Sequence, residues 1–220
     1  MTLIKSISGI RGTIGGVVGE NLTPEDIVKF ASAYGQWLKN RNEPNATLNV
    51  IIGRDARISG EMLNHLVVGT LLGLGINVLD IGLSTTPTVE IAVPMENANG
   101  GIILTASHNP KEWNALKLLN EKGEFISAED GANLLDMADS GAVKYQSVGK
   151  LGAYAKNETY FGKHVQHVSD LALVNKEAIA KKNFKVVIDC VNSTGGIVLP
   201  MLLKALGVNE VIELYCEPNG

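Results

Sequence analysis

The sequence contains little cysteine and no long uncharged apolar run. Cys190 and Cys216 are its only cysteines, and they do not form a CxxC motif. Both lie beside apolar stretches of strand character, so we expect reduced core thiols rather than a disulfide or a redox pair. The chain has no membrane-spanning stretch of about 18 apolar residues, and its N-terminus lacks the pattern of a signal peptide. We therefore expect a cytoplasmic protein without a membrane partner.

Charge of one sign is also sparse. The formal net charge is −4, and no run of five like charges occurs. This balance lacks the electrostatic footprint of a nucleic-acid-binding protein. Low-complexity segments and repeats of fixed period are absent as well. Any phosphate binding must therefore depend on a few placed cations.

The composition is that of a globular protein. Hydrophobic residues make up 45% of the chain and charged residues 19%, which is enough apolar material for packed cores. A length of 220 residues exceeds the commonest size of a single domain, so we expect two domains.

The first part of the chain alternates strand and helix patterns. Thr23 and Pro24 carry the signature of a helix start, and the helix is expected to run to about Asn40. Further strands are expected at residues 48–53, 76–81 and 101–105, and further helices at 59–73 and 86–93. This order predicts a layered α/β fold in which a mixed, mostly parallel sheet is flanked by helices.

A segment of weak periodicity at residues 139–157 suggests a domain boundary. We expect a first domain at residues 1–145 and a second at 155–220. In the second, the pattern predicts helices at 159–169, 175–181 and 194–206 and strands at 185–189 and 210–215. This second α/β domain begins but is not completed, so we expect the chain to be a fragment of a longer protein.

The densest group of reactive residues is Thr105-Ala106-Ser107-His108-Asn109-Pro110. It follows a buried strand, and ligands bind at the carboxyl ends of strands in open α/β sheets. Pro110 disfavours helix at Asn109, so a turn should present Ser107 and His108 to solvent. On spacing alone an ordinary polar turn is an equal alternative. A hydrolase elbow is disfavoured, because Thr105 and Asn109 occupy the glycine positions of GxSxG.

Three further segments offer cations. Arg11 lies between Gly9 and Gly12, where the backbone can approach a ligand, although a solvated arginine in a surface turn is the alternative. In the segment 53–60 we expect a structural ion pair between Arg54 and Asp55, a helix cap at Ser59, and a phosphate contact from Arg57. Lys117 lies in a stretch that could return as a strand to the edge that carries Ser107.

These motifs together resemble one family. The matching stretches are SGIRG at 8–12, GRDAR-x-SG at 53–60, TASHNP at 105–110, NALK at 114–117 and VIDCVNSTGG at 187–196. In this respect the whole chain is similar to the α-D-phosphohexomutases, the group that contains phosphoglucomutase, phosphomannomutase and phosphoglucosamine mutase.

The resemblance implies a role for each candidate residue. Ser107 would be the phosphoserine, and its phosphate would also bind the catalytic Mg²⁺. His108 and Lys117 would transfer protons or steady the phosphoryl group, and Arg11 would contact it. The candidate substrate- and phosphate-binding residues are thus Arg11, Lys117, Arg57 and Asn109. The implied reaction interconverts hexose 1-phosphate and hexose 6-phosphate through a hexose 1,6-bisphosphate intermediate.

Two departures from the family pattern qualify that expectation. The family usually has FGT before SGIRG, whereas this chain has Lys5-Ser6-Ile7, and the family's aspartate-rich DGDxDR metal loop is missing. Because Mg²⁺ needs carboxylates besides a phosphate oxygen, the fragment alone should bind it weakly and show little mutase activity. A non-catalytic sugar-phosphate-binding module and a phosphatase remain the alternatives. The preferred hexose and the oligomeric state stay open.

Overall fold

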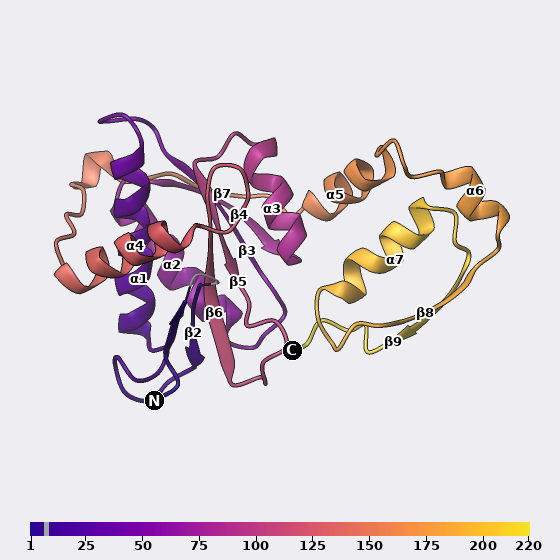
Figure 1. The fold of residues 1–220 in the computed structure, drawn as a ribbon, viewed down its shortest axis with the longest axis horizontal. Helices are drawn as coiled ribbons and strands as arrows, with labels where there is room; N and C mark the ends of the chain where they lie inside the picture. The colour runs from indigo at the N-terminus through magenta and orange to yellow at the C-terminus, as the bar shows by residue number, and fades with distance from the viewer. Residues whose placement is uncertain (7–8) are drawn as a thin grey trace.

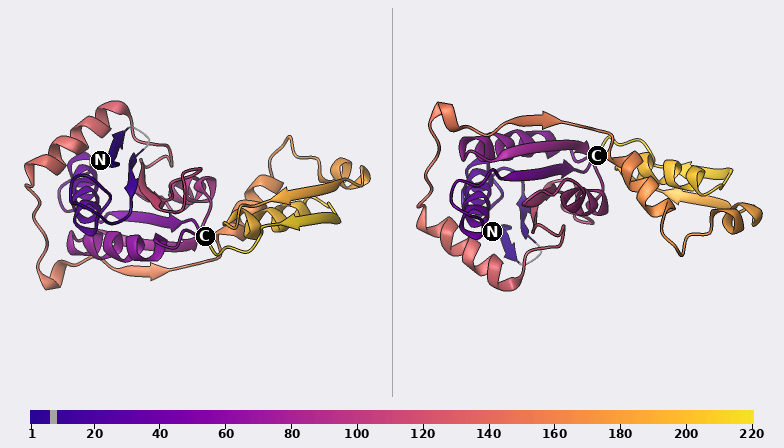
Figure 2. Two further views of the ribbon diagram at one scale, coloured as in Figure 1. Left: turned by 90° about the horizontal axis from the view of Figure 1, so that it is seen from below. Right: turned by 90° about the horizontal axis from the view of Figure 1, so that it is seen from above.

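The computed structural model describes residues 1–6 and 9–220 and shows a larger and a smaller part (Figure 1). Ser8 of the SGIRG motif therefore lies outside the described residues. The larger part is built on a seven-stranded sheet, and the smaller part on a two-stranded parallel sheet. Figure 2 shows the smaller part extending away from one end of the larger.

The large sheet is mixed and has the strand order β1-β2-β6-β5-β3-β4-β7. β3, β4, β5 and β7 run parallel, and β6 is antiparallel to both β5 and β2, so β2 points the same way as the parallel group. The expected mixed, mostly parallel α/β sheet is confirmed. The strands are β1 (Ile4–Ser6), β2 (Gly9–Thr13), β3 (Asn49–Arg54), β4 (Asn77–Leu83), β5 (Gly100–Leu104), β6 (Trp113–Leu119) and β7 (Tyr154–Lys156).

Helices cover both faces of this sheet (Figure 1). One face packs against α1 (Pro24–Arg41), α2 (Gly60–Gly73) and α4 (Ala128–Ser140), and the other against α3 (Thr86–Met95). β5 is buried along its whole length between these layers. α1 begins as the sequence predicts, with a capping box formed by Thr23 and Asp26.

The sequence patterns did not predict α4. Its N-cap Ser127 accepts a hydrogen bond from the backbone N–H of Asp130, and Leu134 and Ala138 are buried. The helix ends at Gly141, which has a left-handed backbone with φ of 64°. Its signals were present in the sequence but were not recognised: Ser127 is a typical N-cap residue, and Leu134 and Ala138 have helical spacing.

The strand β7 extends the larger part beyond the first domain that the sequence predicts. It pairs with β4 and so belongs to the large sheet, whereas the sequence expectation began the second domain at residue 155. A short 3₁₀ turn at Val148–Lys150 precedes it. Because the strand pairing ends at Lys156, we propose that the boundary between the two parts follows this residue.

The smaller part contains α5 (Tyr160–Ser169), α6 (Lys176–Lys181), β8 (Lys185–Asp189), α7 (Gly195–Ala205) and β9 (Glu210–Leu214). α5 and α7 share a small core that includes Phe161, Val165 and Val198. Both cysteines are free; Cys190 is buried and Cys216 is partly exposed. No helix within the described ranges is both long and apolar enough to cross a membrane.

Polar contacts join α3 of the larger part to α5. Glu96 accepts hydrogen bonds from the Tyr160 hydroxyl at 2.6 Å and from Lys163 Nζ at 2.9 Å. These bonds lower the pKa of the Glu96 carboxyl. Thr88 Oγ1 lies 2.9 Å from His164 Nδ1. The junction therefore depends on hydrogen bonds as well as on apolar packing.

Gly100 offers a test of the packing beneath β5. A Cβ at this position would collide with the Tyr34 hydroxyl and lie 2.8 Å from the carbonyl oxygen of Leu119. Tyr34 is buried, and its hydroxyl donates to the carbonyl oxygens of Gly101 and Leu119. We expect Gly100→Ala to lower the free energy of unfolding by about 2–4 kcal/mol in urea denaturation.

Gly69→Ala is the matched control. Gly69 is exposed within α2, and a Cβ there would meet nothing within 4 Å. Alanine should therefore raise the free energy of unfolding by about 0.5–1 kcal/mol. Equal effects of the two substitutions would contradict the packing described for β5.

Candidate active site

The serine turn follows the carboxyl end of β5, where Ser107 and His108 are exposed. Ser107 has a φ of 53°, in the left-handed region that residues other than glycine rarely occupy. Its backbone N–H donates to Thr105 Oγ1 at 3.0 Å. Such a conformation costs about 1–3 kcal/mol and persists only where its surroundings impose it, which is typical of functional sites.

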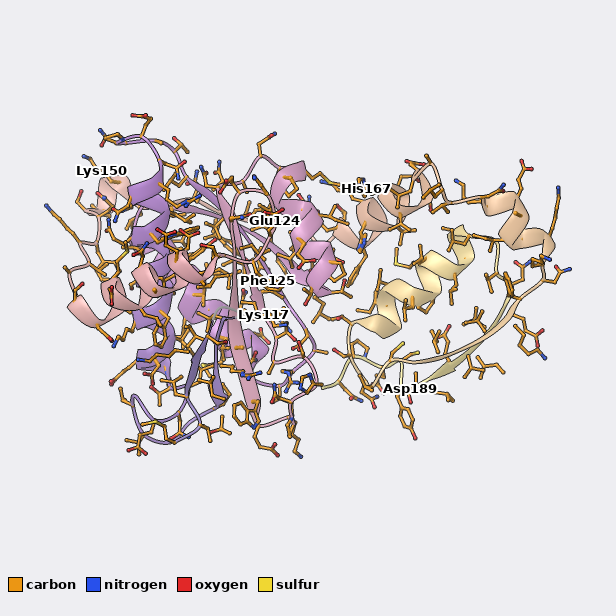
Figure 3. The ribbon with its side chains drawn as sticks, in the orientation of Figure 1. Lys117, Glu124, Phe125, Lys150, His167 and Asp189 are labelled. Atoms are coloured by element: carbon orange, nitrogen blue, oxygen red, sulfur yellow. The ribbon has the colours of Figure 1, made fainter. Side chains whose placement is uncertain are left out.

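Lys117 returns to the serine as the sequence predicts. β6 runs antiparallel to β5 with Lys117 opposite Ile103, and Lys117 Nζ donates to Ser107 Oγ at 2.7 Å. In Figure 3 Lys117 lies next to Phe125, whose ring centroid is 5.8 Å from Nζ. The structure thus brings together two of the candidate residues through a hydrogen bond between a lysine and a serine hydroxyl.

The surroundings of Lys117 weaken its hold on a proton. Burial lowers its pKa below the ordinary lysine value, and the nearby charge of Arg11 lowers it further. Glu90 and Asp55 act in the opposite direction. Burial likewise raises the pKa of Glu90, although Lys117 opposes that shift. Both partners are thus shifted toward their neutral forms, because desolvation outweighs their mutual attraction.

Arg11 reaches the same edge from β2, opposite Ala115 of β6. Gly9 allows this close approach: its φ is 116°, and a Cβ there would lie 3.0 Å from the Cα of Lys117. The Nε of Arg11 is buried, and within residues 1–6 and 9–220 it has no hydrogen-bond partner. An unpaired buried donor is costly, so an acceptor oxygen at this point would be favoured.

Arg57 lies beside the serine turn, but its guanidinium faces backbone carbonyls and Asp55. It pairs with Asp55 through Nε at 3.2 Å, whereas Arg54 reaches only the carbonyl oxygen of Asp55, at 3.4 Å. The expected Arg54–Asp55 ion pair is therefore wrong. Ser59 is also not a side-chain cap, because its hydroxyl makes no cap bond and instead accepts from Asn114 Nδ2 at 2.9 Å.

Asn109 and His108 occupy the tip of the turn. Asn109 Nδ2 donates to the carbonyl oxygen of Ala106 at 2.8 Å, which closes the turn. The imidazole of His108 makes no hydrogen bond to any residue that the structure describes. Both line a cleft of about 430 Å³ between the two parts, whose opposite wall contains Val191, Asn192 and Ser193.

A metal site needs more carboxylates than this chain supplies here. Among the described residues, no group of three or more His, Cys, Asp or Glu side chains could hold a metal ion. Asp55, a carboxylate beside the turn, accepts from Thr105 Oγ1 at 2.6 Å and pairs with Arg57. These residues alone do not fit a magnesium site.

Comparison with known proteins agrees with this geometry. Residues 4–142 match domain I, and residues 162–220 match domain II, of the phosphoglucomutase/phosphomannomutase α/β/α domain models. The chain belongs to the phosphoglucomutase/phosphomannomutase family. It is 35% identical over 214 residues to a phosphoglucomutase/phosphomannomutase of Thermococcus kodakarensis. A phosphoglucosamine/phosphogalactosamine mutase of Sulfurisphaera tokodaii is 34% identical over 204 residues.

The chain spans less than half of these relatives. It covers 45% of the Thermococcus protein and 41% of the Sulfurisphaera protein, while 95% and 90% of the chain itself are matched. A crystal structure of a family protein from Burkholderia thailandensis matches all of the chain and 46% of its own length, with a TM-score of 0.77 and 23% identity. That structure supports the shared fold.

Sequence reasoning missed the contacts of three residues around Ser107 and Lys117. Asp55 was expected to form an ion pair with Arg54, and Thr105 was named only as part of the TASHNP motif. In the structure the Thr105 hydroxyl forms hydrogen bonds with both Asp55 and Ser107. Glu90 lies on α3 and carries no local signal, because only the folded chain brings it near Lys117. No pattern in the sequence pairs Thr105 with Asp55, because the two residues lie 50 positions apart.

The lowered pKa of Lys117 can be measured by NMR titration of the lysine side chains. We expect Lys117 to lose its proton at a lower pH than Lys163, whose pKa is raised by its hydrogen bond to Glu96. Glu90→Gln removes a charge that favours the protonated form, so it should lower the pKa of Lys117 further. A rise in that pKa on Glu90→Gln would contradict the described electrostatics.

Proposed function

We propose that this chain carries the phosphoserine site of a phosphohexomutase that interconverts hexose 1-phosphate and hexose 6-phosphate. One observation carries the proposal: Ser107 Oγ lies 2.7 Å from Lys117 Nζ at the carboxyl edge of the sheet. Family membership and the names of the mutase relatives support this reading. The substrate and the activity of the whole protein are parts of the proposal.

The residues present suit the transfer of a phosphoryl group to and from Ser107. When Ser107 Oγ takes a phosphoryl group from a hexose 1,6-bisphosphate, the Oγ–P bond forms and the sugar O–P bond breaks. The hydroxyl proton of Ser107 then needs an acceptor, and Lys117 Nζ is within hydrogen-bond distance. Its lowered pKa enlarges the neutral fraction that can accept a proton. In the reverse direction Lys117 would return this proton.

The positive charges of Lys117 and Arg11 would stabilise phosphorylated Ser107. A phosphoserine carries about −1.5 to −2 charges near neutral pH. Lys117 already contacts Ser107, and Arg11 is near enough to shift the pKa of Lys117, while the Nε of Arg11 has no partner in the part of the chain that the structure describes. Phosphoryl transfer depends mostly on positioning and on stabilising charge on the phosphoryl oxygens. Lys117 and Arg11 would position the phosphoryl group and stabilise the charge on its oxygens.

The proposal also gives roles to His108 and to Mg²⁺. His108 is exposed on the cleft, where its imidazole would give a proton to the sugar oxygen that leaves the phosphoryl group and take it back in the reverse direction. Bound Mg²⁺ would neutralise charge on the transferring phosphoryl group. A phosphate on Ser107 would give it one oxygen ligand, and carboxylates beyond those at this site would be needed.

Phosphopeptide mapping of the full-length protein from its own host tests the proposal. We expect a phosphate on Ser107, either as purified or after incubation with hexose 1,6-bisphosphate and Mg²⁺. Ser107→Ala should abolish the label, and Lys117→Met should slow labelling by roughly 10²-fold or more, since it removes both the cation and the proton acceptor.

The product distinguishes the remaining alternatives. A mutase converts hexose 1-phosphate into hexose 6-phosphate, whereas a phosphatase releases inorganic phosphate. A full-length protein that binds hexose phosphate but never labels Ser107 would be a non-catalytic binding module, and the mutase proposal would then be wrong.

A further inference from the structure

The guanidinium of Arg57 is fully engaged by the chain itself. Nε donates to Asp55 Oδ2 at 3.2 Å, and each terminal nitrogen donates to two backbone carbonyl oxygens. Nη1 reaches Pro110 at 2.7 Å and Trp113 at 2.9 Å, and Nη2 reaches Ser107 at 2.9 Å and Asn109 at 2.6 Å. An arginine has five N–H donors, so all five have acceptors.

These contacts span the whole serine turn. The four carbonyl oxygens belong to residues between Ser107 and Trp113, the segment that leads from β5 to the first residue of β6. The Arg57 side chain is only 11% exposed and that of Asp55 only 13%. A buried, charge-paired arginine with every donor satisfied forms a rigid connection, because breaking any bond leaves a desolvated group unpaired.

The same network holds the unusual backbone of Ser107 from both sides. Arg57 Nη2 binds the carbonyl oxygen of Ser107, and Thr105 Oγ1 accepts from its N–H. Thr105 in turn donates to Asp55, the carboxylate that pairs with Arg57. The left-handed φ of 53° at Ser107 is thus fixed by hydrogen bonds on its own N–H and its own carbonyl group.

We propose that Arg57 is a positioning residue that holds Ser107 Oγ in line with Lys117 and does not itself bind phosphate. The inference rests on the proposed role of Ser107 as the phosphoryl acceptor. It replaces the expectation of a phosphate contact at Arg57, since a phosphate could reach the guanidinium only by displacing carbonyl oxygens from it. Lysine cannot substitute, because its three donors on one nitrogen cannot reach four carbonyl groups and a carboxylate.

Single-turnover labelling of the full-length enzyme with labelled hexose 1,6-bisphosphate and Mg²⁺ tests the inference. For Arg57→Lys we expect the maximal rate of Ser107 phosphorylation to fall by roughly 10²-fold, the typical effect of misplacing a reacting group by about 1 Å. The bisphosphate concentration at half-maximal rate should change less than about threefold, because Arg57 makes no phosphate contact. A residue that binds phosphate would give the opposite pattern.

Arg41→Lys is the matched control. Arg41 lies on α1, pairs with Asp130 at 3.2 Å and is remote in sequence from the turn, so this variant should label like the wild type. Asp55→Asn is the second variant if Arg57→Lys does not fold; it keeps the shape of the network but weakens its charge. It should reduce the maximal rate by at least about tenfold with the half-maximal concentration preserved.

The outcomes separate this inference from the proposed function. If the wild type labels at Ser107 and both variants label at the wild-type rate, Arg57 is not a positioning residue and the inference is wrong. If the half-maximal concentration rises while the maximal rate is kept, Arg57 binds phosphate and the inference is again wrong. A wild type that never labels would overturn the proposed function itself.

Discussion

The antiparallel return of β6 beside β5 is the constraint on which the site depends. A parallel β6 would need a crossover connection of a dozen or more residues, whereas residues 105–112 link the two strands directly and keep the serine turn beside β6. The observed register sets Lys117 opposite Ile103, and β2 then pairs with β6 so that Arg11 lies opposite Ala115. Arg11 on β2, Lys117 on β6 and the turn after β5 are thereby brought to one edge of the sheet. The sheet, and not the serine turn alone, determines which cations reach Ser107.

The positively charged residues near the serine turn differ in how their donors are used. Arg57 is neutralised by Asp55 and saturated by carbonyl oxygens, so it contributes rigidity. Among the described residues the buried Nε of Arg11 has no partner, and Lys117 contacts the hydroxyl directly, so both keep capacity for an anion. Electrostatic stabilisation is strongest when the groups that provide it are already fixed before the charge develops. Arg57, paired with Asp55, thus fixes the turn beside which Arg11 and Lys117 lie.

The sequence predicted the framework of the site better than its internal contacts. Apolar periodicity and turn residues were enough to locate β5, the turn and β6, because these signals are local. The pairing of Asp55 was assigned to the adjacent Arg54, yet β3 ends at Arg54, and in the turn that follows, Asp55 accepts from the backbone N–H of Arg57. Arg57 thus meets Asp55. The carbonyl oxygens that Arg57 binds and the approach of Glu90 depend on long-range packing, for which the sequence carries no pattern.

Backbone strain is found on both walls of the cleft. Ser107 has a φ of 53° on one wall, and Val191 and Asn192 have φ values of 45° and 53° on the other. A left-handed conformation is costly for a β-branched residue such as Val191, and ordinary turns rarely place one there. Its neighbour Asn192 is held by a backbone bond to Tyr215 at 2.7 Å, so the strand ends of β8 and β9 impose the turn. A residue other than glycine keeps a left-handed backbone only where the surrounding structure imposes it, and such residues cluster at binding and catalytic sites, so the strain on both walls supports a functional role for this cleft.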